Sequence, residues 1–379
     1  MAERAPRGEQ APDETGFRTL LARDVARAYA DRRTLRQDFD ELYRFYLDTE
    51  SRRKLAGMGR FRRGVSVGVW IFGSLLRKLS PGRRLAVAGS LVIFVLAAVK
   101  FRLGNVMVDF NALPIGFFLL LVVLMLELKD KLLAKDEIAI AREVQLALLP
   151  SEAPRLAGWS FWFTTRPAND VGGDLIDTLE RGEGRLGIAL GDVAGKGLGA
   201  ALLMAKLQAT LRAVAPECVD LGVLGGRLNV ILQRDGLANR FATLFYCEIE
   251  CDRGGIRFVN AGHNPPFLLK SGRITILPAA SIPLGILAGS AYAEERVDLA
   301  AGETLLVYSD GVTEARNAAG EEYGEERLRA VFVRCAGLPA AEAGERILRE
   351  VDAFIGGTRP HDDLSLFVAV RESTRTLPV

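Results

Sequence analysis

The chain has 379 residues, more than one average domain, and its 49 basic residues nearly balance its 47 acidic ones. Two histidines are too few for a histidine-based metal site, and the four scattered cysteines form no CxxC pair that would indicate zinc or redox chemistry. We therefore expect two or more regions with reduced, cytoplasmic cysteines, in which any bound metal is held by oxygen.

Residues 1–63 form the first region, which we expect to be a cytoplasmic segment. Residues 1–15 are polar and lack the apolar core of a signal peptide, so we predict disorder there. Residues 31–50 carry Leu35, Phe39, Leu42 and Tyr46 at helical spacing. This spacing predicts an amphipathic helix on a partner or membrane surface, with a solvated helix as the alternative.

Ten basic residues and no acid lie between residues 52 and 84. They are Arg52, Arg53, Lys54, Arg60, Arg62, Arg63, Arg77, Lys78, Arg83 and Arg84. Nucleic acid or an anionic membrane surface would explain such a cluster. The apolar segments that follow favour the membrane, so we expect contact with a lipid bilayer and none with nucleic acid.

Residues 64–128 contain three apolar runs, which predict a membrane region. The run 65–76 would be about 18 Å long as a helix, too short for a hydrocarbon core of about 30 Å, and its arginine-rich flanks favour an interfacial placement. Segments 85–101 and 110–128 predict two transmembrane helices, with apolar runs of about 22 and 28 Å. Basic flanks place both ends in the cytoplasm of a multi-pass inner-membrane protein. A buried core hairpin is the alternative.

Residues 129–150 predict a linker helix that ends at Pro150. One heptad register of apolar residues is interrupted by Glu137, and a second is interrupted by Gln145. Such a weakly specified seam fits a homodimer contact or packing on the next domain equally well.

Residues 151–379 alternate between strand-like and helix-like segments. Strands are predicted at about residues 160, 185, 241, 255, 266, 273, 303 and 364, and helices at about 198–214, 219–235, 325–335 and 340–355. Short turns such as DRGG and SG join consecutive strands, which indicates antiparallel pairing. We therefore predict an α+β layered domain rather than a doubly wound parallel sheet.

Four places in this domain put an aspartate at the end of an apolar strand or in a glycine turn. They are Asp174 in VGGDLID, Asp192 in GDVAGKG, Asp310 in YSDGVTEARN and Asp362 in HDDLSLFV. Each alone is an ordinary turn residue. If the strands pack in one pair of sheets, the carboxylates converge, and two of them about 5 Å apart repel by roughly 3 kcal/mol. Hard divalent cations, Mg²⁺ or Mn²⁺, would compensate, and two such ions can activate water for displacement at phosphorus.

The GDVAGKG segment is not a nucleotide-binding phosphate loop. Only three residues separate Gly191 from Gly195, and Gly197 follows Lys196 where a serine or threonine is needed. We expect its glycines to turn the chain out of the strand 185–190 into a helix near Leu198, which presents Asp192 to metal.

The ordered motifs VGGDLID, GDVAGKG, NAGHNPP, YSDGVTEARN and DDLS resemble the SpoIIE/RsbU branch of the PPM-type metal-dependent serine/threonine protein phosphatases. The resemblance covers about residues 138–371. It implies a β-sandwich of two antiparallel sheets with helices outside, and hydrolysis of phosphoserine or phosphothreonine on a protein. Substrates of this branch are typically STAS-domain anti-sigma-factor antagonists.

The resemblance also implies site residues. Asp192 matches the aspartate that bridges two Mn²⁺ or Mg²⁺ ions, and the carbonyl of Val193 is expected to complete one site. Asp174 matches an acid at the metal centre that can orient water. Asp310 and Asp362 match the remaining acidic ligands.

Other candidates lie beside these ligands. Asp363 is expected to be a neighbour of the site, and Asp177 a supporting residue around it. Asn260, His263 and Asn264 lie in a turn that either approaches the site or is an ordinary Asn-Pro turn. Lys196 either meets a substrate phosphate or is a solvated lysine at a helix start.

The first functional hypothesis is a membrane-tethered phosphatase of residues 151–379 whose linker helix relays a signal. The alternative is a non-catalytic membrane scaffold with the same fold that binds phosphoproteins. A metal-dependent nuclease or nucleotidyl cyclase is a third reading, and the failed phosphate-loop spacing gives it little support.

Overall fold

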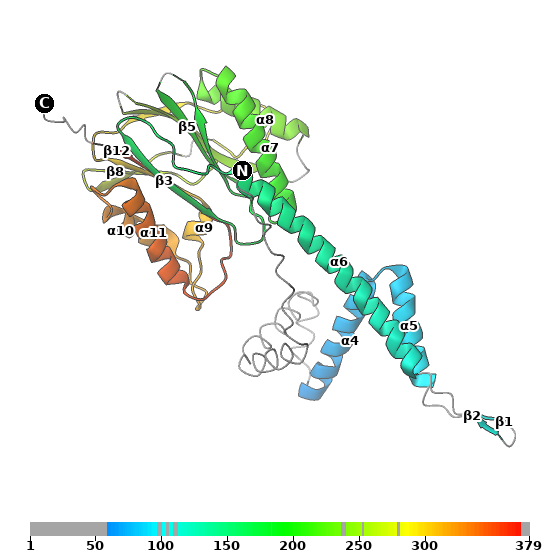
Figure 1. Cartoon of the computed structure of the whole chain (residues 1–379). Helices are drawn as coiled ribbons and strands as arrows, with labels where there is room; N and C mark the ends of the chain where they lie inside the picture. The colour runs from blue at the N-terminus through cyan, green and yellow to red at the C-terminus, as the bar shows by residue number, and fades with distance from the viewer. Residues whose placement is uncertain are drawn as a thin grey trace, which may run out of the picture. The chain divides into compact units, whose positions relative to one another are not determined.

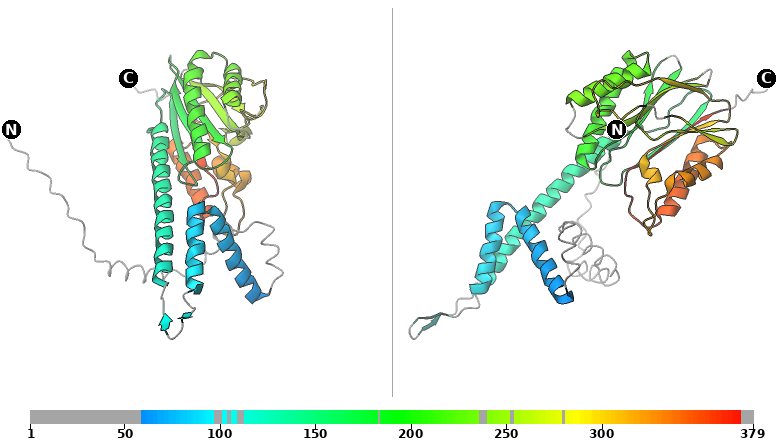
Figure 2. Two further views of the ribbon diagram at one scale, coloured as in Figure 1. Left: turned by 90° about the vertical axis from the view of Figure 1, so that its right-hand side faces the viewer. Right: turned by 180° about the vertical axis from the view of Figure 1, so that it is seen from behind.

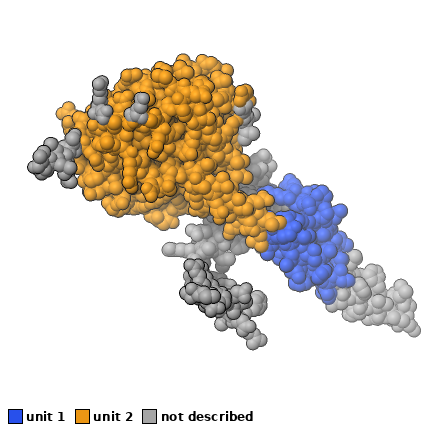
Figure 3. Space-filling model, turned by 45° about the horizontal axis from the view of Figure 1, so that its top comes forward, with its two compact units in different colours: residues 1–131 blue, residues 132–379 orange. Residues whose placement is uncertain are grey.

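The computed structural model describes residues 59–96, 101–103, 106–108, 113–182, 184–235, 240–251, 254–278 and 281–372. The chain divides into two compact units, residues 1–131 and 132–379 (Figure 3). The amphipathic helix expected over 31–50 lies outside the described residues, as does the rest of 1–58.

The first unit contains helices that include the predicted apolar runs. Helix α4 (Arg60–Lys78) includes the predicted interfacial run 65–76, and α5 (Pro81–Leu96) includes the first part of the predicted transmembrane segment 85–101. Strands β1 (Phe101–Leu103) and β2 (Val106–Val108) pair antiparallel. Helix α6 (Leu113–Leu148) begins in this unit, and its 36 residues make it about 54 Å long. It joins the predicted segments 110–128 and 129–150 in one uninterrupted helix.

Arg83 and Arg84 of the basic cluster have partners within the protein. Arg83 contacts the carboxylates of Glu127 at 2.7 Å and Asp130 at 2.6 Å, both on α6. Arg84 donates to the carbonyls of Leu76, Arg77 and Leu79. Since the last carbonyls of a helix lack partners within it, Arg84 caps the C-terminal end of α4.

Within the described residues, the one helix that is long and apolar enough to cross a membrane covers Leu198–Glu217, and half of it is buried inside the protein. It belongs to the core of the second unit. Helix α5 has 16 residues. The apolar part of α6 begins at Leu113 and ends before Glu127. The two-helix transmembrane hairpin therefore stays a prediction.

The second unit is a sandwich of two five-stranded sheets with helices on both outer faces (Figures 1 and 2). One sheet has the order β10-β7-β6-β5-β4 and the other β3-β12-β11-β8-β9, and all neighbouring strands are antiparallel. The first sheet comprises β4 (Leu175–Glu180), β5 (Arg185–Val193), β6 (Ala242–Glu250), β7 (Gly255–Ala261) and β10 (Glu295–Asp298). The second comprises β3 (Trp159–Arg166), β8 (Phe267–Lys270), β9 (Arg273–Ile276), β11 (Thr304–Tyr308) and β12 (Leu364–Arg371). The predicted α+β antiparallel architecture is confirmed.

Alternation along the strands builds three hydrophobic layers. In β6, Phe245 and Cys247 point between the sheets, whereas Leu244 and Tyr246 point toward the helices of the same unit. The outer layers are covered by α7 (Leu198–Val214) and α8 (Leu221–Asp235) on one side, and by α10 (Gly324–Val333) and α11 (Ala340–Ile355) on the other (Figure 1). Because both faces of each sheet are buried, we expect polar functional residues in the loops at the strand ends.

Candidate active site

The predicted acids lie at strand ends of both sheets. Asp192 is the penultimate residue of β5, and Asp174 immediately precedes β4. The pairing of Leu175 with Gly191 brings these two acids to the same end of the first sheet. Asp310 begins the short helix α9 (Asp310–Thr313) just after β11, and Asp362 lies two residues before β12 in the second sheet.

The GDVAGKG segment turns as the sequence predicts. Gly195 has φ of 111° and Gly197 has φ of 75°, a region of backbone conformation that favours glycine. Helix α7 then begins at Leu198. The segment therefore ends a strand and starts a helix, and Asp192 lies at the strand end.

The carboxylates act on one another electrostatically. Burial raises the pKa of Asp192 to about 7, and repulsion from Asp310, Asp362 and Asp363 adds to the shift. Burial also raises the pKa of Asp310, with further contributions from Glu314 and Asp362. The pKa of Asp174 is raised by burial and then by Asp192. Because such repulsion requires proximity, the two sheets bring the acids into one cluster.

This cluster has the chemistry of a site for a hard cation. Asp174 is 4% exposed, and its Oδ2 has no hydrogen-bond partner among the described residues. A Cβ placed on Gly173 would stand 3.0 Å from the carbonyl oxygen of Val193 and 3.4 Å from Oδ1 of Asp192, so these two oxygens line one space. Carboxylate and carbonyl oxygens are the ligands that Mg²⁺ and Mn²⁺ prefer.

The ligand set is not arranged as a finished coordination site. Among the described residues, no group of three or more histidine, cysteine or acidic side chains is placed to hold an ion as it stands. The assignment of Asp174, Asp192, Val193, Asp310 and Asp362 to metal therefore stays a prediction.

Asp363 holds the loop that carries Asp174. Its Oδ1 accepts the backbone N–H of Ala168 at 2.7 Å, and its Oδ2 accepts that of Gly173 at 2.5 Å. Both carboxylate oxygens are thus engaged by backbone donors. Asp363 therefore positions the backbone just before Asp174, and its place beside metal ligands stays a prediction.

The structure directs Asp177 away from the cluster. It lies within β4, is fully buried, and accepts two hydrogen bonds from Arg212 of α7 at 2.7 and 2.6 Å. Its partner lies in the last turn of α7, whereas the cluster lies at the start of that helix. The expected role for Asp177 around the metal site is therefore replaced by an ion pair between sheet and helix.

The turn of Asn260, His263 and Asn264 is an Asn-Pro turn that also approaches the acidic cluster. The side chain of Asn260 bonds both to the backbone N–H and to the carbonyl of His263, as in a structural turn. His263 also contacts the hydroxyl of Thr243 at 2.9 Å, and that hydroxyl accepts the backbone N–H of Asp192. Burial lowers the pKa of His263 to about 4, so it is neutral at pH 7. Asn264 is half-buried in the same turn.

Lys196 is engaged within the protein. Its Nζ donates to the carbonyl of His361 at 2.6 Å and lies 2.9 Å from Oδ2 of Asp362. It is not simply a solvated lysine, because it joins the GDVAGKG segment to the loop before β12.

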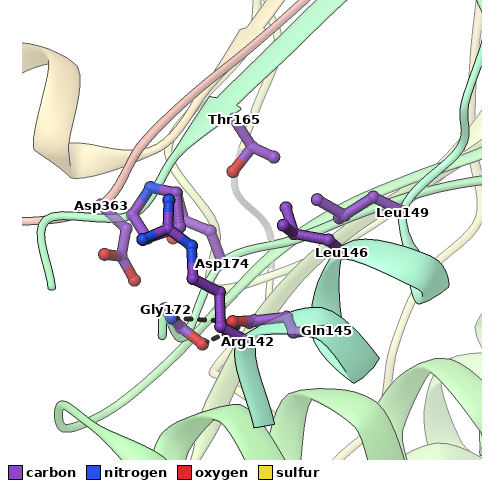
Figure 4. A pocket seen from close by; sticks show the side chains of 9 residues that line it. Arg142, Gln145, Leu146, Leu149, Thr165, Gly172, Asp174 and Asp363 are labelled. Atoms are coloured by element: carbon purple, nitrogen blue, oxygen red, sulfur yellow. Dashed lines mark hydrogen bonds between the residues drawn. The ribbon is translucent and has the colours of Figure 1, made fainter. Parts of the chain in front are cut away.

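Gln145 is a site-adjacent residue that the sequence did not reveal. Its Nε2 donates to the carbonyl of Gly172 at 2.7 Å, and its Oε1 accepts the N–H of Gly172 at 3.0 Å (Figure 4). The same small cavity is lined by Asp174 and Asp363. The polar residue that interrupts the second heptad register thus docks α6 onto the loop before Asp174. In the first register, Leu133, Ile140 and Val144 are exposed.

Comparisons with known proteins agree with this fold. The family model described as stage II sporulation protein E (SpoIIE) matches residues 182–372, half of the chain. "Phosphoserine phosphatase RsbU" of Bacillus subtilis is 30% identical over 188 residues, which cover 49% of this chain and 56% of that protein. "Protein IcfG" of Synechocystis is 30% identical over 264 residues, 62% of this chain and 41% of that protein. The chain thus spans about half the length of these curated relatives.

Two solved structures share the fold. The SiaA-PP2C domain of Pseudomonas aeruginosa superposes with a TM-score of 0.55 at 20% identity, covering 64% of this chain and 99% of that domain. The PP2C phosphatase domain of SpoIIE from Bacillus subtilis, solved with a fragment of its regulatory domain, gives a TM-score of 0.50 at 20% identity over 57% of this chain and 64% of that one.

Proposed function

The chain belongs to the SpoIIE family, and from this membership and the carboxylate cluster we propose that it is a metal-dependent protein serine/threonine phosphatase. The observation that carries the proposal is the convergence of acids from two sheets. The pKa of Asp192 is about 7 because burial and its neighbours oppose its charge, so a cation would relieve a real electrostatic cost. A scaffold that only binds phosphoproteins would have no need of this arrangement.

The proposed roles follow the positions of the side chains. Two bound Mn²⁺ or Mg²⁺ ions would supply a nucleophilic water and neutralise the phosphate oxygens during in-line displacement. Asp192, Asp310 and Asp362 would hold the ions, with the carbonyl of Val193 beside Asp192. Asp174 is buried with an unpartnered oxygen, which suits orienting the attacking water. Asp363 fixes the loop of Asp174 through backbone hydrogen bonds.

The substrate would approach beside Asp362. A cavity of about 230 Å³ lies there, and its lining includes Arg166, Gly311, His361 and Asp362. We propose a phosphoserine or phosphothreonine of a regulatory protein as the substrate. A STAS-domain anti-sigma-factor antagonist is the class that the family resemblance favours.

Membrane tethering is a further part of the proposal. Phe94 of α5 and Phe117, Phe118 and Leu124 of α6 are 64 to 69% exposed. Large apolar side chains exposed at this level call for cover by lipid or by another protein. We propose a multi-pass inner-membrane protein with the catalytic domain in the cytoplasm, and a homodimer contact through the exposed register of α6.

The direct test is hydrolysis of a phosphoserine peptide by the full chain in detergent, with Mn²⁺ and with EDTA. We expect phosphate release that depends on Mn²⁺. A protein that retains the phosphopeptide and releases no phosphate would support the scaffold alternative instead. Release of pyrophosphate from a nucleoside triphosphate would favour a cyclase.

A further inference from the structure

Lys196 lies between two glycines with positive φ, Gly195 and Gly197, in the turn between β5 and α7. Its ammonium reaches across to the loop before β12, where it contacts the carbonyl of His361 at 2.6 Å and Asp362 at 2.9 Å. One side chain therefore connects loops that are 165 residues apart in sequence.

The charged side chains nearest this ammonium are acidic. Asp362 and Asp310 lie on its side of the cluster, and Lys196 opposes the rise in the pKa of Asp310. Arg240 approaches the same turn, but it donates to the backbone carbonyl of Ala194 rather than to an acid. Within the described part of the chain, Lys196 is thus the one basic side chain that forms an ion pair with an acid of the cluster.

We propose that Lys196 is an internal counter-cation that competes with the divalent metal for Asp362. The proposal rests on the proposed metal site. Oδ1 of Asp362 accepts the backbone N–H of Asp363 at 2.9 Å, so Oδ2, the oxygen that Lys196 contacts, is the one left for a metal. A divalent ion about 2.0 to 2.2 Å from Oδ2 would strongly repel an ammonium held on that same oxygen. Metal binding therefore displaces Lys196, whose side chain is 46% exposed and free to move into solvent.

Displacement has a structural consequence. When the ammonium leaves Asp362, the contact between the turn before α7 and the loop before β12 is lost. The freed ammonium then lies at the mouth of the site, where a phosphate dianion would attract it. Metal occupancy and the conformation of residues 194–198 are therefore coupled.

The test measures metal binding, not turnover. Titration calorimetry with Mn²⁺ compares the wild type with Lys196→Met, which removes the ammonium, and Lys196→Arg, which keeps a positive charge. Lys270→Met is the matched control. Lys270, at the end of β8, also contacts a carbonyl and a carboxylate, those of Asp298 and Glu303. Thermal unfolding verifies that each variant is folded.

We expect Lys196→Met to bind Mn²⁺ about two- to fivefold more tightly, the range that a half-exposed ion pair supports. Lys196→Arg and Lys270→Met should stay within about twofold of the wild type. Unchanged or weaker Mn²⁺ binding by folded Lys196→Met would overturn the role of Lys196 and leave the phosphatase proposal standing. Failure of every form, wild type included, to bind Mn²⁺ would overturn both.

Discussion

The side chain amide of Gln145 and the backbone of Gly172 exchange two hydrogen bonds, of 2.7 and 3.0 Å. Gln145 is in the last turns of α6, and Gly172 lies two residues before Asp174. A second contact supports the same end of the helix, because Gln208 of α7 donates to the carbonyl of Leu148 at 2.7 Å. The end of α6 is thus anchored to the loop and the helix that flank the acidic cluster.

Gln145→Ala should lower both stability and activity. The substitution leaves the buried N–H and C=O of Gly172 without partners, which costs about 1 to 3 kcal/mol. The loop of Asp174 then loses one of its two anchors, so we expect turnover to fall about tenfold or more. Denaturant unfolding and phosphopeptide turnover measure the two effects. Val144→Ala is the control, since Val144 is 57% exposed on the same helix; equal turnover in both variants would contradict the anchoring role.

Asp177→Asn should lower stability and leave Mn²⁺ affinity nearly unchanged. The variant breaks the contacts of a fully buried carboxylate with Arg212. We expect a loss of about 1 to 3 kcal/mol of unfolding free energy, below the full cost of breaking a buried pair because the Arg212 side chain is 51% exposed. The Mn²⁺ dissociation constant should stay within about twofold of the wild type. A large loss of Mn²⁺ affinity in folded Asp177→Asn would return this residue to the metal site.

Stability without metal should fall as pH rises. Burial raises the pKa of Asp192 from 3.8 to about 7, so the folded chain keeps a proton that the unfolded chain has released. The contribution is fully present below pH 3.8 and is lost as pH rises through about 7. Thermal unfolding in EDTA between pH 4 and 8, compared with Asp192→Asn, measures this contribution. A wild-type curve parallel to that of Asp192→Asn would show that Asp192 does not titrate in this range.

Mn²⁺ affinity should change with pH in the opposite direction. Protons compete with the ion for Asp192, so affinity should weaken by up to about tenfold for each pH unit below 7 and level off above it. Calorimetry at pH 6, 7 and 8 measures the trend. Affinity independent of pH over this range would mean that Asp192 is already ionised when the ion arrives.

The sequence predicted much of the second unit because its signals are local. The turn after β5, the start of α7 at Leu198 and the antiparallel pairs depend on glycine and on alternation within short segments. Strand β4 (Leu175–Glu180) was not predicted, because Asp177 and Thr178 interrupt its apolar pattern. The partner that makes a buried Asp177 tolerable, Arg212, lies 35 residues away.

Long-range contacts explain the remaining differences. Gln145 looked like an interruption of a heptad seam, and only its pairing with Gly172 gives it a role. The polar edge strand β10 (Glu295–Asp298) is defined by its register with β7 and not by its own composition. Similarly, the contact of Lys196 with the loop before β12 depends on the two sheets packing together.

Fractionation tests the membrane assignment. The full chain should sediment with membranes and stay there after a high-salt wash, because apolar insertion resists salt whereas electrostatic binding does not. Detergent should release it. Recovery of the protein in the supernatant after high salt alone would contradict the membrane-spanning hairpin, and residues 132–379 expressed alone serve as the soluble comparison if they fold.

The most direct measurement is a crystal structure of the protein soaked with Mn²⁺, with anomalous scattering used to locate the ion. We expect an anomalous peak within about 2.0 to 2.2 Å of oxygens of Asp192 and of at least one of Asp310 and Asp362. Peaks found only elsewhere, or none at a Mn²⁺ concentration that supports turnover, would contradict it.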